Sequence, residues 1–194
     1  MQQTVEVLIM KQNLWFSLVV AIPLLTAATM TFGDEDDDGF ISFFKRQPGV
    51  APVTSELYRE ECGSCHFAYQ PGWLPEQSWR DMMSSLNDHF GDNAELSQAN
   101  NRLILDYLVN NSADKSDFRR SKKVMRSLGS YASPQRITEL GYIKHEHDEI
   151  PNRLIAENDK VGSLSQCNAC HQDADQGGFR EGNIKIPGHG KWDD

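Results

Sequence analysis

The sequence predicts a mainly α protein of short helices joined by loops, and three observations support this class. Apolar residues between Trp79 and Phe90 recur at helical spacing, glycines and asparagines punctuate the remaining chain, and no alternating pattern of useful strand length is present. At 194 residues the chain is long enough for one domain, or for two very small ones. Only 39% of it is hydrophobic, and much of that lies in residues 1–33, so the remainder would form a thin core.

The first 33 residues have the pattern of an export segment. Lys11 precedes an apolar run from Leu14 to Phe32, which is the order of an n-region and an h-region. The run is long for a signal peptide and almost long enough to span a bilayer, so a cleaved signal and an uncleaved anchor are both open. In either case we expect the bulk of the chain to be exported to the periplasm.

Residues 34–53 are predicted to form an acidic linker followed by an apolar docking segment. The run from Asp34 to Asp38 has the composition of a solvated linker, and its spacing fits a calcium loop poorly. The cluster after it is expected to dock on the folded body and comprises Phe40, Ile41, Phe43 and Phe44.

Two helices are expected next. Thr54 and Ser55 form a helix start, and His66 should lie at the end of the helix that they begin. Pro75 should occupy the first position of the second helix, which Gly91 should stop. His89 falls on the apolar stripe of this second helix, which consists of Trp79, Met82, Met83, Leu86 and Phe90.

The rest of the chain is more polar. A third helix is expected over residues 96–109, and its inward side chains should be Leu103, Ile104, Tyr107 and Leu108. The basic island Arg119–Lys123 is ordinarily one solvated helix face, and the alternative is a contact with acidic groups of a cofactor or partner. A last short helix should run from about Val161 to Cys170.

All four cysteines lie in two Cys-x-x-Cys-His motifs, at Cys62, Cys65 and His66 and at Cys167, Cys170 and His171. Two thiols three positions apart can each add to a vinyl group of a haem, and the histidine that follows can ligate the iron. A thioredoxin-like site requires a βαβ context, which is absent, and structural zinc pairs usually lie about 12–20 residues apart. Disulfides would not require a histidine after each pair. The motifs therefore predict two covalent c-type haems with iron.

With the haems included, the predicted fold is that of a c-type cytochrome, in which short helices and loops pack around two covalent haems. Residues 54–128 are expected to form an N-terminal haem region, and residues 129–194 a C-terminal one.

The formal net charge of −9 argues against a nucleic-acid partner, because phosphate binding needs clustered Lys and Arg. An acidic redox protein would instead be steered toward a basic patch on its protein partner.

The sixth ligand of each iron decides the function. A second strong ligand gives a low-spin electron carrier, whereas an open position gives a peroxidase-like enzyme or a gas-binding haem protein. His89 is the best candidate because its stripe must face the apolar ring, and at most one of His145 and His147 should ligate. His189 is the remaining histidine, and the alternative ligands are Met82, Met83 and Met125. The histidine count favours a carrier without a catalytic residue.

With these residues in place, the chain resembles the dihaem cytochrome c family from about Leu57 to Pro187. The most specific parts are the two Cys-x-x-Cys-His motifs, Tyr69 with Pro71, Leu74-Pro75 to Trp79, Asp88-His89-Phe90-Gly91, Arg136-Ile137-Thr138-Glu139 and His147-Asp148-Glu149-Ile150-Pro151. The resemblance implies two bis-histidine haems, with His89 and His147 as distal ligands. The chain departs from the pattern by an additional histidine, His145.

The resemblance also implies redox partners. Family members look like electron donors to a small oxygen-binding monohaem cytochrome, the sphaeroides-type haem protein. A membrane b-type cytochrome is the implied reductant. By proximity in the sequence, we expect His89 to serve the first haem and His147 the second.

Overall fold

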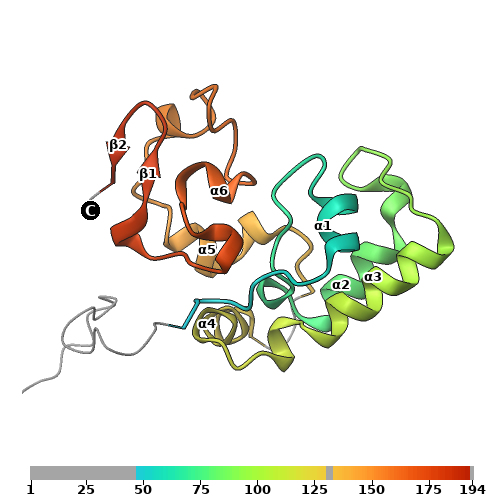
Figure 1. Cartoon of the computed structure of the whole chain (residues 1–194). Helices are drawn as coiled ribbons and strands as arrows, with labels where there is room; N and C mark the ends of the chain where they lie inside the picture. The colour runs from blue at the N-terminus through green and yellow to red at the C-terminus, as the bar shows by residue number, and fades with distance from the viewer. Residues whose placement is uncertain (1–46, 130–132, 193–194) are drawn as a thin grey trace, which may run out of the picture. The chain divides into compact units, whose positions relative to one another are not determined.

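The computed structural model describes residues 47–129 and 133–192. In this part of the chain the α-helices are α1 (Glu56–Cys62), α2 (Glu76–Ser84), α3 (Gln98–Asn110), α4 (Arg119–Leu128), α5 (Gly141–His145) and α6 (Cys167–Cys170) (Figure 1). The strands β1 (Lys185–Ile186) and β2 (Gly190–Lys191) form one antiparallel hairpin. The mainly α class is therefore confirmed. The predicted export segment, the acidic run and the cluster Phe40–Phe44 lie outside the described residues.

Single 3-10 turns fill much of the chain between the helices. They are η1 (Pro71–Trp73), η2 (Leu86–Asp88), η3 (Ala113–Lys115), η4 (Ile137–Glu139), η5 (Asn152–Leu154), η6 (Ala174–Gln176) and η7 (Glu181–Asn183). Short elements of this kind cannot bury much apolar surface individually, so their stability comes from packing against one another. No helix within the described ranges is both long and apolar enough to cross a membrane.

Helix α1 begins where the sequence predicts, because the Ser55 hydroxyl accepts a hydrogen bond from the Tyr58 amide at 3.2 Å. Ser97 caps α3 in the same way, through the Asn100 amide. Pro75 is the N-cap of α2 and not its first helical residue. The expectation that α1 would extend to His66 is wrong, since the helix ends at Cys62 and His66 follows in a turn.

The second helix is also shorter than predicted. The hydroxyls of Ser84 and Ser85 donate to the Asp81 carbonyl at 2.8 and 3.0 Å, so these side chains compete with the backbone at the helix end. Helix α2 stops at Ser84, and the chain continues as η2 and a tight turn. Phe90 lies beyond the helix and is 42% exposed, which corrects its predicted inward position.

Two further predictions are corrected. Leu103 on α3 is 60% exposed, because neighbouring helical residues point about 100° apart and Ile104 and Leu108 already face the core. The last helix does not begin near Val161. The amides of Val161 and Gly162 both donate to the Asn158 carbonyl at 2.8 Å, and Gly162 has a φ of +73°, so this segment is a turn.

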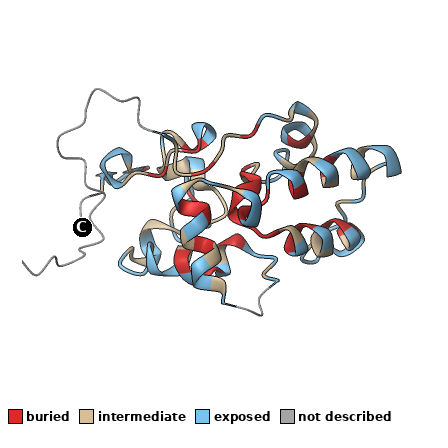
Figure 2. Ribbon diagram, turned by 90° about the horizontal axis from the view of Figure 1, so that it is seen from below, coloured by how far each residue is buried: buried red, intermediate tan, exposed pale blue. Residues whose placement is uncertain are grey.

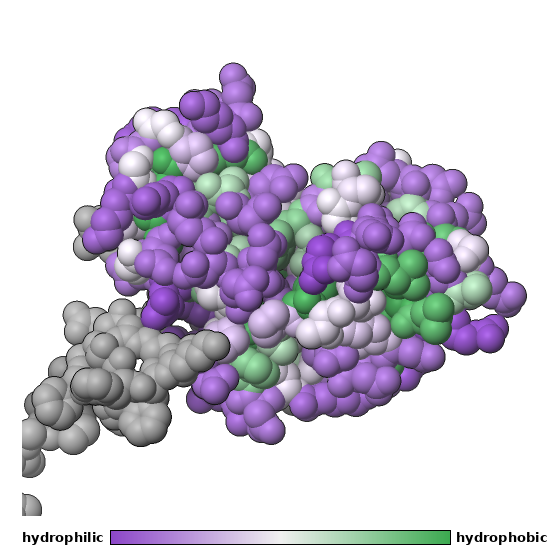
Figure 3. Space-filling view, in the orientation of Figure 1, coloured by the Kyte–Doolittle hydropathy of each residue, from purple (hydrophilic) through white to green (hydrophobic). Residues whose placement is uncertain are grey.

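The core lies where the helices meet. Helix α2 packs against α3, α1 also contacts α3, and α4 contacts α5, η1 and η3. Buried residues, red in Figure 2, run along one side of each long helix and leave the other side exposed. Figure 3 shows a largely hydrophilic face on which apolar side chains reach the surface in patches. The largest fully buried apolar side chains are Leu74, Ile104, Leu108, Leu140, Val50 and Val124.

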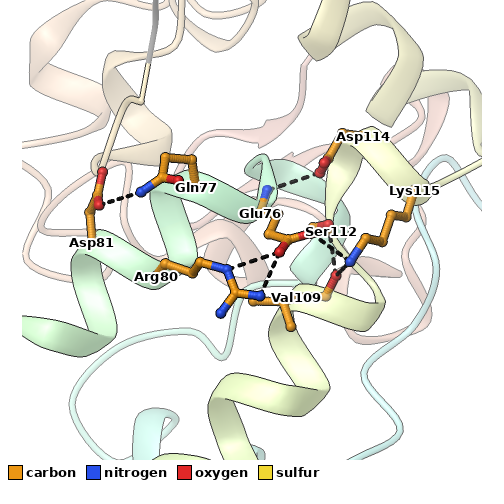
Figure 4. Close-up of polar contacts among 8 residues, drawn as sticks. All are labelled: Glu76, Gln77, Arg80, Asp81, Val109, Ser112, Asp114 and Lys115. Atoms are coloured by element: carbon orange, nitrogen blue, oxygen red, sulfur yellow. Dashed lines mark hydrogen bonds and ion pairs between the residues drawn. The ribbon is translucent and has the colours of Figure 1, made fainter.

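A polar network fixes the start of α2 (Figure 4). The amide of Glu76 donates to an Asp114 carboxylate oxygen at 2.9 Å. The Glu76 carboxylate pairs with Lys115 at 2.6 Å and with Arg80 at 2.6 Å, and the Lys115 and Arg80 hydrogen bonds lower its pKa. Lys115 also donates to the Val109 carbonyl at 2.8 Å. The network therefore ties α2 to the end of α3 and to η3.

Segments from the two predicted haem regions share contacts. Gln70 is fully buried, donates to the Ala174 carbonyl at 2.6 Å and accepts from the Trp73 indole at 3.0 Å. Gly49 and Val50, from the predicted docking segment, also donate to the Gly177 carbonyl at 2.8 and 3.3 Å. The described residues accordingly belong to one compact unit.

We expect Gly177→Ala to destabilise the protein more than Gly162→Ala. The two glycines have φ values of +72° and +73°, so both substitutions incur about 1–2 kcal/mol for a left-handed alanine. A Cβ at Gly177 would also lie 2.1 Å from the Val50 carbonyl oxygen, whereas nothing lies within 4 Å at Gly162. Overpacking adds about 1–3 kcal/mol. Thermal unfolding of the two variants checks this, and equal midpoints would contradict the close contact.

Candidate functional site

The structure brings His66 and His89 together. Their ring centres are 6.2 Å apart and their planes differ by 25°. His66 follows α1, and its Nδ1 lies 2.7 Å from the Phe67 carbonyl oxygen, which leaves Nε2 free to act as a ligand. His89 follows η2, and its amide donates to the Asp92 carbonyl at 2.7 Å. Burial lowers the pKa of His89, with smaller contributions from His66 and Arg136.

His147 and His171 form a second pair, with ring centres 5.9 Å apart and planes at 77°. His147 follows α5, and its Nδ1 lies 2.7 Å from the Ile143 carbonyl oxygen. His171 follows α6 and packs edge-on against Phe179. Its Nδ1 is buried without a hydrogen-bond partner. Burial first, then His147 and Arg120, lower the pKa of His171 to about 3. Neutral imidazole is the form that ligates metals.

Both gaps have the width of one metal ion. An imidazole nitrogen bonds a transition metal at about 2.0–2.1 Å and lies roughly 1.2 Å from its ring centre, so two opposed ligands have ring centres about 6.4–6.6 Å apart. The observed separations of 6.2 and 5.9 Å are slightly shorter than this value. Within the described ranges no group of three or more His, Cys, Asp or Glu side chains could hold an ion. The other ligands of a metal at either pair must therefore come from a bound group.

The cysteine thiols fit covalent attachment of such a group. None of the four is in a disulfide. Burial raises the pKa of Cys62 to about 11, with a contribution from Glu61, and raises that of Cys167 to about 12. Burial also raises the pKa of Cys170. Redox-active cysteines have lowered pKa values instead. The raised pKa values of Cys62, Cys167 and Cys170 give no sign of a redox-active thiol, and the four free cysteines are available for thioether bonds.

The remaining candidates lie elsewhere. His145 is 74% exposed and its Nδ1 lies 3.5 Å from an Asp148 carboxylate oxygen. The His189 ring packs against Trp192, with centres 5.8 Å apart. Met83 is buried in the core and Met82 packs against it. The structure thus places a histidine beside each motif histidine and gives His145 another partner.

Arg120 is a buried cation behind the second pair, which corrects the prediction that the basic island is only a solvated face. Its guanidinium donates to the Tyr142 hydroxyl, to the Glu146 carboxylate at 3.1 Å and to the Phe179 carbonyl at 2.5 Å. Glu146 precedes His147, and the Phe179 ring touches His171. One side chain therefore holds the segments that carry both histidines.

Tyr69 connects the two motifs. Its ring lies 5.1 Å from the His66 ring, and its hydroxyl donates to the Ser165 carbonyl at 3.0 Å, two residues before Cys167. Burial and the nearby Cys167 raise its pKa, so the hydroxyl keeps the proton of this hydrogen bond. The sequence offered one signal for Tyr69, its place in the first family motif, and none for the burial of Arg120.

Comparisons with known proteins show which family the chain is similar to. The family model for dihaem cytochrome c matches residues 58–179. A diheme cytochrome c from Shewanella baltica is 41% identical, with a TM-score of 0.58, over 71% of this chain and 97% of that one. A diheme cytochrome c from Rhodobacter sphaeroides is also 41% identical, with a TM-score of 0.60, over 67% of this chain and 100% of that one. The search of curated proteins gives no match.

We expect Arg120→Met to lower the free energy of unfolding by about 1–3 kcal/mol, because it leaves the buried Phe179 carbonyl without its donor and removes the buried partner of the Glu146 carboxylate. Arg80→Met is the matched control, since it removes an exposed pair with Glu76 that contributes about 0–1 kcal/mol. Denaturant unfolding of both variants measures the difference. A loss at Arg120 no larger than that at Arg80 would show that the network is not structural.

Proposed function

Because the chain belongs to the dihaem cytochrome c family, we propose that it is a periplasmic carrier that passes single electrons between redox proteins through two bis-histidine haems. The observation that carries the proposal is the pairing of each motif histidine with one further histidine, at ring separations of 6.2 and 5.9 Å. In this arrangement the iron ligands are His66 with His89, and His171 with His147. A filled sixth position favours electron transfer over ligand chemistry.

Two c-type haems are the cofactors of the family, and they supply reversible one-electron chemistry at iron. Cys62 and Cys65 hold the first haem, and Cys167 and Cys170 hold the second. The chain's own contribution is to fix ring orientation and to limit access to the iron. The backbone carbonyls at Phe67 and Ile143 perform the first task, because each holds the Nδ1 side of one ligand.

The surface charge supports a protein partner. With a net charge of −9, the carrier would be attracted to a basic surface around the redox centre of its partner. We propose a small oxygen-binding monohaem cytochrome as the acceptor and a membrane b-type cytochrome as the donor, following the family resemblance. Export by the N-terminal segment would place the carrier in the periplasm with both.

The spectrum of the purified holo-protein tests the ligand assignment. We expect two haems per chain, both low-spin when oxidised and when reduced, without the near-infrared band of methionine ligation. His89→Ala and His147→Ala should each convert about one haem per chain to the high-spin form, because each removes one strong axial ligand. His145→Ala is the matched control and should leave both haems low-spin.

Two outcomes would contradict the proposal. A high-spin fraction approaching one haem per chain in the unmodified protein would indicate an open iron site and a peroxidase-like or gas-binding function. A high-spin signal in His145→Ala but not in His147→Ala would show that the second distal ligand is misassigned.

A further inference from the structure

We infer that Arg136 is a positioning residue that holds His89 at the first haem iron by stacking on Phe90. This inference rests on the proposed function, in which His89 is the sixth ligand. Arg136 does not touch the iron, and it acts through the phenyl ring beside the ligand. Its effect is to keep the first iron closed to small molecules.

The turn that carries His89 is strained, and its backbone hydrogen bonds are local. Phe90 has a φ of +60°, the only positive value for a residue other than glycine in the described part of the chain. A bulky side chain in this region is unfavourable and persists only where its surroundings hold it. The backbone of the turn is closed by hydrogen bonds between His89 and Asp92, at 2.7 and 3.3 Å. These bonds are local, so they do not fix the turn to the rest of the protein.

The side chains supply the long-range contact. The Phe90 ring lies 4.7 Å from the His89 ring. The guanidinium carbon of Arg136 lies 3.9 Å from the centre of the Phe90 ring, which is within the range of a cation–π interaction. Phe90 is 42% exposed, and Arg136 packs over its ring on the solvent side.

Buried neighbours anchor the backbone at Arg136. It is the N-cap residue of η4, and the next residue, Ile137, is 6% exposed. Leu140 ends the same turn and is 1% exposed. Glu139 lies 3.7 Å from the Arg136 side chain and orients the guanidinium group. The backbone at Arg136 is thus anchored in the core while its side chain reaches over the distal turn.

Carbon monoxide binding to the reduced holo-protein tests this inference, because carbon monoxide can bind only after an axial histidine leaves. At a saturating concentration the binding rate reports the opening of the distal turn. Loss of an exposed cation–π contact changes an equilibrium constant by about 2- to 5-fold. Arg136→Ala should therefore increase the rate of carbon monoxide binding at one haem by that factor. Phe90→Leu should give a similar increase, and the double variant no further increase, because both changes remove one interaction.

Three controls separate positioning from a general loss of stability. Arg136→Lys retains the cation and should restore a rate close to that of the unmodified protein. Arg153→Ala removes another exposed arginine, in η5, and should leave the rate unchanged. In a His89→Ala background, where the ligand is already absent, Arg136→Ala should have no effect on the rate.

The outcomes distinguish this inference from the function on which it rests. If His89→Ala leaves both haems low-spin, the ligand assignment itself is wrong. Suppose instead that His89→Ala produces a high-spin haem. If Arg136→Ala and the unmodified protein then bind carbon monoxide at the same rate, or if neither binds it, Arg136 does not hold the ligand. An equal acceleration by Arg153→Ala would likewise overturn the role of Arg136.

Discussion

Each proposed haem site depends on two imidazole rings that lie close together although they come from segments well separated in the sequence. Short helices suit this requirement because each of them positions a proposed ligand just beyond its own end. His66 follows α1, His147 follows α5 and His171 follows α6. His89 follows the 3-10 turn η2. The loops between these elements therefore set the ligand geometry, and side-chain contacts are needed to hold the loops.

The two sites are held in different ways. At the second pair a buried guanidinium joins the segments that carry both histidines, and its charge is partly balanced by Glu146. Removing one member of such a buried pair is costly, so this site is expected to be rigid. At the first pair the distal turn is exposed and is covered by a stacked arginine. We therefore expect the first site to open more easily than the second.

Much of the architecture could be predicted from local rules. The cap at Ser55, the third helix and the mainly α class follow from residue preferences that act over a few positions. The family model confirms the dihaem identity that the two Cys-x-x-Cys-His motifs indicated. Matching the family pattern also selected His147, which lies beside His171 in the structure.

The misplaced elements have physical causes that periodicity does not reveal. The stripe on α2 continues in the sequence past Ser84, but two serine hydroxyls bind the carbonyl that the next turn would need. A run of basic residues is typical of a solvated face, yet Arg120 is buried because its partners come from two distant segments, α5 with its C-cap and the chain at Phe179. Such long-range compensation cannot be inferred from local composition.

Tyr69 gives the two prosthetic groups a continuous connection through the protein. Three peptide bonds lead from His66 to Tyr69, its side chain spans to the Ser165 carbonyl, and two more peptide bonds reach Cys167. A single hydrogen bond is the only non-covalent step in this sequence of atoms. An electron tunnelling along it would cross no empty space. The hydrogen bond from the Tyr69 hydroxyl to the Ser165 carbonyl is the step of this path that motion of the two segments would lengthen first.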